Sequence, residues 1–152
     1  MSTFKQALSA ILGILAISVL PAAAANVRDC DWAASTQSLA EPWEKNTKVF
    51  LNGAVRIALV DTGGEPVCCS AHLLILAENK SDEQGTKTCR LISNSQQLGY
   101  EAIDFAKITS SYHPARGLQL VMPFKLYVDG LTDRRGVARI TINTQNGVIT
   151  AR

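Results

Sequence analysis

The chain has 152 residues, with 15 Lys and Arg against 13 Asp and Glu, and its formal net charge is +2. So small a net charge, with no block of like charges, gives no reason to expect nucleic acid, a membrane surface or a strongly acidic substrate as a partner. The length suits one domain with a substantial core.

The N-terminus has the layout of a secretory signal peptide. One cation, Lys5, precedes an uncharged apolar stretch, and Ala23 and Ala25 fit the small-residue pattern of a cleavage site. The alternative is an uncleaved membrane anchor, but the apolar block 7–20 is shorter than the ~20 residues that a membrane-spanning helix needs. We therefore expect residues 1–25 to be removed, with no membrane span after cleavage and a periplasmic or secreted product.

Residues 26–47 are polar and lack a sustained period, which predicts an N-terminal arm with a helical turn near 35–40. The arm carries both tryptophans, Trp32 and Trp43. Such tryptophans either anchor a partner or a sugar, or plug the open end of the domain. The plug is the favoured interpretation, because a disulfide at Cys30 would hold the arm against the core.

From residue 48 onward the apolar pattern predicts β-strands, and residues 48–152 are expected to form one β domain. The run Leu73–Leu76 is apolar on both faces, which predicts a central strand. Asn146 and Gly147 predict a two-residue hairpin between the last two strands. The expected strands lie within 49–60, 67–77, 87–93, 118–128, 137–144 and 148–151, with a weaker one at 100–108.

Residues 118–128 form the clearest alternating pattern, with Leu and other apolar residues on one phase and Pro123 on the other. Because proline cannot donate a ladder hydrogen bond, this strand is expected at a sheet edge, or with a bulge at the proline.

In total, about seven or eight strands at short intervals predict an all-β fold. The favoured architecture is an antiparallel, immunoglobulin-like β-sandwich, and the alternative is a small barrel.

The four cysteines, Cys30, Cys68, Cys69 and Cys89, predict two disulfides, because an even count in an exported small domain is typical of a disulfide framework. Side chains of adjacent strand residues point to opposite faces, so a bond between Cys68 and Cys69 is not expected. Cys89 is in phase with Leu91 and should face the core with Cys69. The favoured pairing is Cys69–Cys89 with Cys30–Cys68, and the alternative is Cys30–Cys69 with Cys68–Cys89.

No set of residues in the sequence converges on a catalytic mechanism. Ser70 and His72 would be about 6–7 Å apart on one strand face, beyond the reach of a catalytic hydrogen bond. His72 is instead expected to be a half-exposed strand residue. The adjacent cysteines lack the helix start and the Cys-x-x-Cys spacing of a redox pair, and Cys68 would be about 13 Å from His72, too far to share a metal ion. No catalytic residue, cofactor or metal site is therefore predicted.

The favoured hypothesis is a non-enzymatic exported module that binds a protein or another component of the cell envelope through edge strands and loops. The possible binding surface comprises Trp32, Trp43, Tyr112, Arg134 and Arg135, because aromatic side chains anchor partners and arginines suit an anionic one. The alternative is a small-ligand or polysaccharide-binding domain that uses the aromatic members. A hydrolase or a thiol-redox protein is a weaker alternative.

Overall fold

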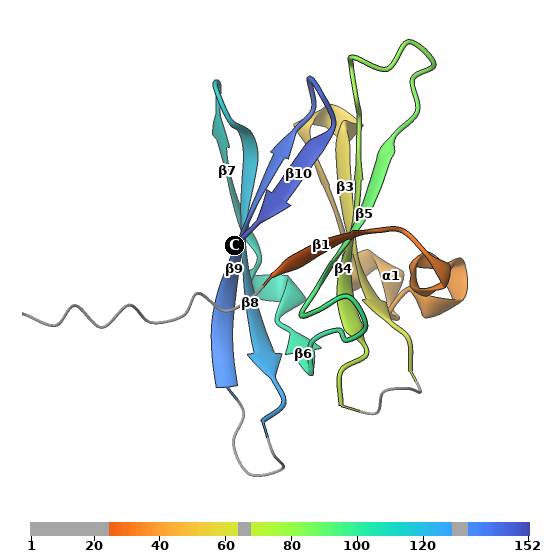
Figure 1. Cartoon of the computed structure of the whole chain (residues 1–152), viewed down its shortest axis with the longest axis vertical. Coiled ribbons are helices and arrows are strands. Elements are labelled where there is room, and N and C mark those ends of the chain that lie inside the picture. Colours follow the sequence, from red (N-terminus) through yellow and green to blue (C-terminus); the bar gives the residue numbers. More distant parts are fainter. Residues whose placement is uncertain (1–24, 64–67, 129–133) are drawn as a thin grey trace, which may run out of the picture.

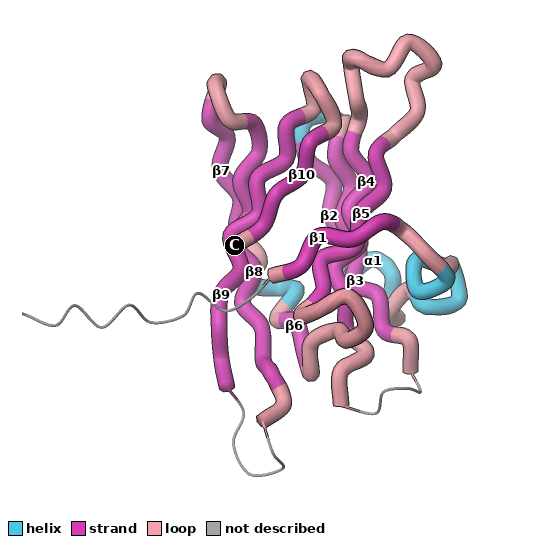
Figure 2. Tube along the Cα trace, in the orientation of Figure 1, coloured by secondary structure: helices cyan, strands magenta, loops and turns pink. Residues whose placement is uncertain are grey.

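The structure is a computed structural model that describes residues 25–63, 68–128 and 134–152. The predicted signal peptide, apart from its last residue, and the segments 64–67 and 129–133 lie outside these residues, so the first residue of the strand expected within 67–77 is not described. The described chain forms two antiparallel sheets of five strands each, with only short helical segments (Figures 1 and 2). The predicted all-β antiparallel class is therefore confirmed, with ten strands in place of seven or eight. No helix of the described part is long and apolar enough to cross a membrane.

The first sheet has the strand order β1-β5-β4-β3-β2. In the second sheet the order is β10-β9-β8, and the free side of β8 pairs with β6 along one part and with β7 along another. The strands of the first sheet are β1 Asn26–Asp29, β2 Thr47–Phe50, β3 Val55–Asp61, β4 Ala71–Ala77 and β5 Thr88–Ser93. Those of the second are β6 Ala102–Ile103, β7 Thr109–His113, β8 Gly117–Leu126, β9 Arg134–Asn143 and β10 Val148–Ala151. The helical segments are η1 Trp32–Ala34, η2 Thr36–Ser38, α1 Trp43–Asn46, η3 Leu51–Gly53 and η4 Phe105–Lys107.

One core cluster joins the two sheets. It is built from the inward phase of each strand, as the alternating apolar patterns predict. Its largest fully buried members are Ile57, Leu73, Ile75 and Ile92 from the first sheet, Leu120, Met122, Ile140 and Ile142 from the second, and Tyr100 before β6. The Tyr100 ring packs against Phe124 with the ring centroids 4.5 Å apart.

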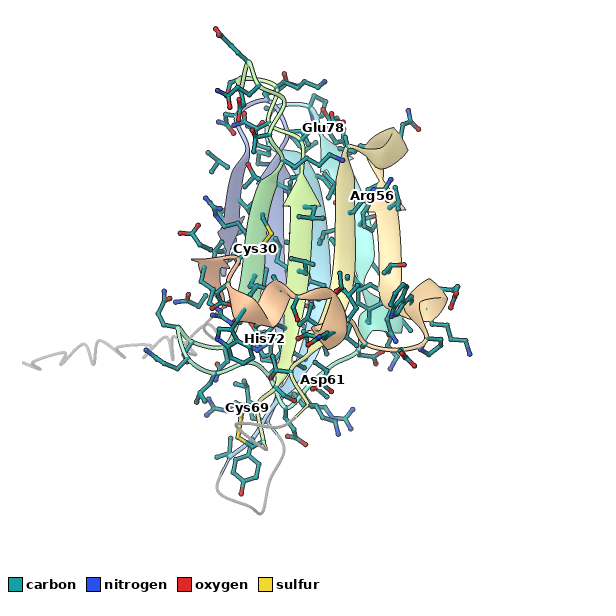
Figure 3. All side chains as sticks on the ribbon, turned by 90° about the vertical axis from the view of Figure 1, so that its right-hand side faces the viewer. Cys30, Arg56, Asp61, Cys69, His72 and Glu78 are labelled. Carbon is teal, nitrogen blue, oxygen red and sulfur yellow. A yellow bond between two sulfur atoms is a disulfide. The ribbon has the colours of Figure 1, made fainter. Side chains whose placement is uncertain are left out.

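Strand β4 occupies the centre of the first sheet, as the apolar run Leu73–Leu76 predicts. One face of β4 belongs to the core between the sheets, and the other face packs under the N-terminal arm. On that outer face Leu74 clusters with Ala33 of the arm and with Leu91 of β5. Figure 3 shows the helical turns of the arm passing in front of this sheet. Both faces of β4 are thus removed from water, which explains the continuous apolar run.

The prediction from the sequence that β8 lies at a sheet edge is wrong. β8 lies between β9 and the two strands β6 and β7, and Pro123 pairs with Val137 of β9. On the other side of β8, β6 pairs only as far as Phe124 and β7 only as far as Val121. Pro123 therefore lies where the neighbouring strand is interrupted by η4. Proline has no N–H group to donate, but no strand lies opposite Pro123 there, so no ladder hydrogen bond is lost.

The prediction of a two-residue hairpin loop before β10 is also wrong. Asn143 pairs with Val148, so the loop has four residues, 144–147. Two asparagine side chains hold it: Asn143 Oδ1 accepts from the Gln145 N–H at 2.9 Å, and Asn146 Oδ1 accepts from the Val148 N–H at 3.0 Å. These side-chain bonds stabilise a longer turn than the Asn-Gly pair alone indicates.

All four cysteines form disulfides, but the predicted pairing is wrong. The bonds are Cys30–Cys89, with Cα atoms 5.6 Å apart, and Cys68–Cys69. Strand β4 begins only at Ala71, so strand alternation does not apply to the adjacent pair. Cys89 shares the phase of Leu91, as expected, but this phase faces the arm, where Cys30 lies. Figure 3 shows Cys30 over the middle of the sheet and Cys69 at its lower end.

Candidate functional site

Strand β7 is an open edge of the second sheet. It pairs with β8 on one side, and no other strand of the described residues pairs with it. All five residues of Thr109–His113 are exposed, and none is Lys, Arg, Asp, Glu or Pro. Proteins usually protect an open edge with charges, prolines or bulges, because its free N–H and C=O groups can pair with another chain. β7 has neither charges nor prolines and can therefore accept an additional strand.

Hydrogen bonds on β8 establish which of its residues face β6 and β7. The Pro123 carbonyl accepts from the Asp104 N–H at 3.0 Å, and the Lys125 carbonyl accepts from the Glu101 N–H at 3.1 Å. Both donors lie on the β6 side of the strand. Because the N–H and C=O groups of one strand residue point to the same side, the odd-numbered residues of β8 direct these groups toward β6 and β7.

The same register defines the free groups of β7. Ser110 lies opposite Leu120, and Tyr112 lies opposite Leu118, both even-numbered residues that direct their backbone groups toward β9. The N–H and C=O groups of Ser110 and Tyr112 therefore face away from β8, toward the open side. A partner strand would bond to these two residues first.

A tight turn holds β7 against β8. The Arg116 N–H donates to the His113 carbonyl at 3.0 Å, and the Ala115 N–H donates to His113 Nδ1 at 3.2 Å. Gly117 follows with φ +94°, and a Cβ atom there would collide with the carbonyl oxygen of Ile142. Only glycine fits this backbone conformation and this close approach. No strand is expected at 109–113 from the sequence, because Pro114 and Gly117 make this segment typical of a loop.

A groove of about 510 Å³ lies between β6, η4 and the β8–β9 pair. Pro123 and Val137 line it together with charged groups at its rim. Lys107 Nζ donates to Asp104 Oδ2 at 2.6 Å, and this bond, with a smaller contribution from the charge of Arg135, holds the pKa of Asp104 below its ordinary value. The groove combines apolar walls with a partly neutralised rim, so it suits a small apolar group such as a side chain of a partner.

The aromatic members of the predicted surface lie on three separate elements. Trp32 is on η1, Trp43 on α1 and Tyr112 on β7, with exposed fractions of 70%, 53% and 58%. The interpretation of the tryptophans as buried plugs is therefore wrong. Alanines and other small residues of the arm, such as Ala33, fill the contact with the sheet instead. Figure 1 places α1 and β7 on opposite sides of the molecule, so Trp43 and Tyr112 do not share a platform.

The two predicted arginines differ in orientation. Both are exposed on β9, where Ala138 and Ile140 define the buried phase. Arg135 has the opposite phase, pairs with Lys125 and lines the groove beside β6. Arg134 shares the buried phase but lies at the very start of the strand. Only Arg135 therefore belongs to the outer face of the second sheet.

A buried polar chain, missed at the sequence level, lies under the arm. His72 Nδ1 is 2.8 Å from Ser93 Oγ, which accepts from Arg28 Nε at 3.1 Å, and Arg28 forms an ion pair with Asp31. His72 is only 4% exposed and Ser93 0%, so the expectation of a half-exposed histidine is wrong. Burial is the main cause that lowers the pKa of His72 to about 4, and the charge of Arg28 adds to it. The pair resembles a base and a nucleophile, but both side chains are buried and hydrogen-bonded to each other.

No group of three or more His, Cys, Asp or Glu within the described residues is placed to hold a metal ion. Comparison of the chain with protein-family models, with curated proteins and with solved structures gives no match. The open edge of β7 and the surface around it are thus the features from which a function can be inferred.

Proposed function

We propose that this chain is an exported, non-enzymatic β domain that binds an extended segment of an envelope protein as an additional strand on β7. The observation that carries the proposal is the open, uncharged edge at Thr109–His113, with the N–H and C=O groups of Ser110 and Tyr112 facing away from β8. Strand addition uses such edges, with the main chain supplying affinity and neighbouring pockets supplying specificity. The groove beside β6 is a candidate for such a pocket.

Export to the periplasm or the cell exterior is part of the proposal. The layout of the first 25 residues and the two disulfides both support it, because thiols oxidise stably outside the cytosol. The proposal also takes the two sheets as an immunoglobulin-like sandwich, which leaves sheet edges available. The core cluster with side chains from both sheets supports that packing.

A polysaccharide-binding function is the alternative, and the exposure of Trp32 and Trp43 is the observation that favours it. Exposed aromatic rings can stack on sugars. The placement of the aromatic side chains on separate elements counts against one continuous sugar platform. An enzymatic function has less support, because His72 and Ser93 are buried and hydrogen-bonded to each other.

Site-specific photocrosslinking in cells that produce the protein tests the proposal. A photoreactive phenylalanine analogue replaces Tyr112 on β7 or, as a matched control, Tyr127, which is similarly exposed but lies after the end of β8. We expect a discrete adduct with one envelope protein from position 112 and none from position 127. Equal adduct yields at both positions, or none at either, would count against strand addition.

A proline substitution then separates strand addition from contact through side chains. Ser110→Pro removes an N–H group that faces the open side of β7, and we expect it to abolish the adduct at position 112. Val49→Pro is the matched control, because Val49 lies on β2, the edge of the other sheet, and is also exposed. An adduct that survives Ser110→Pro would show that β7 does not bond to the partner through its backbone.

A further inference from the structure

The small net charge conceals an uneven distribution between the sheets. Residues 26–101, which contain the first sheet, hold seven Lys and Arg against ten Asp and Glu, whereas residues 102–152 hold seven against three. Asp104 is the one acid of 102–152 among the described residues, and it pairs with Lys107. The second sheet therefore carries a marked excess of cations.

Two of these cations are directly opposite each other on neighbouring strands. The Arg139 N–H donates to the Arg152 carbonyl at 2.8 Å, and the Arg152 N–H donates to the Arg139 carbonyl at 3.1 Å. Ala138 and Ile140 are buried, so the Arg139 side chain lies on the outer face, and the directly opposite Arg152 shares that face. Such a pair has Cα atoms about 5.5 Å apart.

Arg116 brings a third guanidinium to the same place. It comes from the β7–β8 turn, and it lines two adjoining depressions of about 160 and 200 Å³ together with Arg139 and Arg152. The other residues that line them are uncharged, and several are hydrogen-bond donors: Ser111, Gln119, Thr141 and Thr150. No acidic residue lines either depression.

This arrangement is unfavourable for the isolated domain. Like charges directly opposite on adjacent strands destabilise a sheet. None of the ion pairs among the described residues involves Arg116, Arg139 or Arg152. The repulsion is relieved if an anion binds between the three side chains.

We propose that Arg116, Arg139 and Arg152 form a binding site for a phosphate group. Guanidinium groups bind phosphate oxygens through paired, charge-assisted hydrogen bonds, and the surrounding hydroxyl and amide groups supply further donors. The three guanidinium groups carry three positive charges, and no acid lines the depressions. A phosphate monoester carries about two negative charges near neutral pH, so it balances these cations better than a ligand with one carboxylate does.

The site is independent of strand addition on β7. The arginine side chains lie on the outer face of the sheet, whereas strand addition uses the backbone of Ser110 and Tyr112 at its edge. Loss of phosphate binding would leave the photocrosslink at position 112 unaffected, and Ser110→Pro would leave phosphate binding unaffected. The two proposals can therefore fail separately.

Titration of the purified domain with inorganic phosphate tests the site. We expect saturable NMR shifts of the Nε–H groups of all three arginines and a rise of the melting temperature with phosphate, because a ligand that binds only the folded state stabilises it. Arg139→Gln should weaken the affinity about tenfold or more. Without phosphate this variant should melt at the same or a higher temperature than the unsubstituted domain, because the like-charge contact is removed.

Arg56→Gln is the matched control, because Arg56 is an exposed arginine on β3 of the other sheet (Figure 3). It should leave the affinity unchanged. Arg152→Gln should weaken phosphate binding as Arg139→Gln does. Agreement of the two variants would show that the loss does not come from a folding defect in one of them.

Vesicles with phosphatidic acid, compared with phosphatidylcholine vesicles, identify the source of the bound phosphate group. Tighter binding than to inorganic phosphate assigns a lipid headgroup, and equal binding assigns a soluble phosphate. The proposal is overturned if neither probe saturates, if both cluster variants bind as the unsubstituted domain does, or if Arg56→Gln loses as much.

Discussion

The Nδ1 atom of His72 lies 2.8 Å from the Oγ atom of Ser93, inside a polar chain that continues through Arg28 to Asp31. Ser93 Oγ accepts from Arg28 Nε, so its hydroxyl hydrogen is available to His72. In a neutral imidazole with its hydrogen on Nε2, Nδ1 accepts this hydrogen bond. Protonation of His72 would remove this acceptor and place a second cation near Arg28.

The free energy of unfolding should therefore depend on His72 in mildly acidic solution. The unfolded chain protonates this side chain below the ordinary histidine pKa of 6.5, but in the folded state the pKa is about 4. The stabilisation is complete above pH 6.5 and is lost as the pH falls toward 4, by up to roughly 3 kcal/mol. Urea denaturation should show a flatter pH profile over this window for His72→Asn. The neighbouring acids Asp31 and Asp61 are present in both proteins, so parallel profiles would contradict the prediction.

The two disulfides should contribute very different amounts to stability. Cys30–Cys89 joins residues 59 apart in sequence, which corresponds to about 4 kcal/mol by the chain-entropy relation. Cys68–Cys69 joins adjacent residues and closes no loop of chain. Replacement of Cys30 and Cys89 by serine should lower the free energy of unfolding by about 4 kcal/mol, and the same replacement at Cys68 and Cys69 by less than about 1 kcal/mol. Equal losses in denaturant titrations would refute this difference.

The sequence predicts the strands well where a strand has one environment along its length. β4 reads as an apolar run because the core covers one face and the arm the other, and β8 alternates because one face meets solvent. The all-β class and the central position of β4 follow from these patterns. Pro123 wrongly indicates a sheet edge, because the neighbouring strand is interrupted opposite it by another part of the chain, the η4 turn.

The candidate site is less accessible to sequence reasoning, because it depends on strand order. β7 carries Thr and Tyr but also lies beside Pro114 and Gly117, which are typical of a loop. The opposition of Arg139 and Arg152 follows only from the β9–β10 register, which a four-residue loop establishes. The Cys30–Cys89 bond likewise requires knowledge that the arm lies on the outer face of β5.

Lys48 should stabilise the contact between β2 and η4. Its Nζ atom donates to the carbonyl oxygens of Phe105, Ala106 and Ile108 at 3.0–3.2 Å, at the C-terminal end of the η4 turn, where a lysine interacts favourably with the carbonyl groups. Lys48→Met keeps the aliphatic stem and removes the donors, so the free energy of unfolding should fall by about 1–3 kcal/mol. Lys45→Met is the control, since the amino group of Lys45 makes no hydrogen bond among the described residues. Equal effects of the two substitutions in urea titrations would exclude this role.

The two tryptophans should be dispensable for folding. Trp32 is 70% exposed and Trp43 is 53% exposed, so replacement of both by alanine removes little buried apolar surface. The free energy of unfolding should change by less than about 1 kcal/mol. Thermal denaturation followed by circular dichroism measures this change. Unfolding of the double variant would contradict this prediction, whereas a folded variant that loses sugar binding would favour the polysaccharide hypothesis.

Proline substitutions on β7 should distinguish its two sides. Ser111 lies opposite Gln119, an odd-numbered residue that directs its backbone groups toward β7, so Ser111→Pro removes a ladder hydrogen bond. The N–H group of Ser110 faces the open side, where proline is tolerated. Ser111→Pro should therefore lower the free energy of unfolding by about 1–3 kcal/mol more than Ser110→Pro does. Urea denaturation of the two variants measures the difference, and faster hydrogen exchange at the Gln119 N–H would report that the remaining bond of this pair is weakened as well. If Ser110→Pro is the more destabilising of the two, the open side of β7 is assigned to the wrong residues, and strand addition would have to use Ser111 instead.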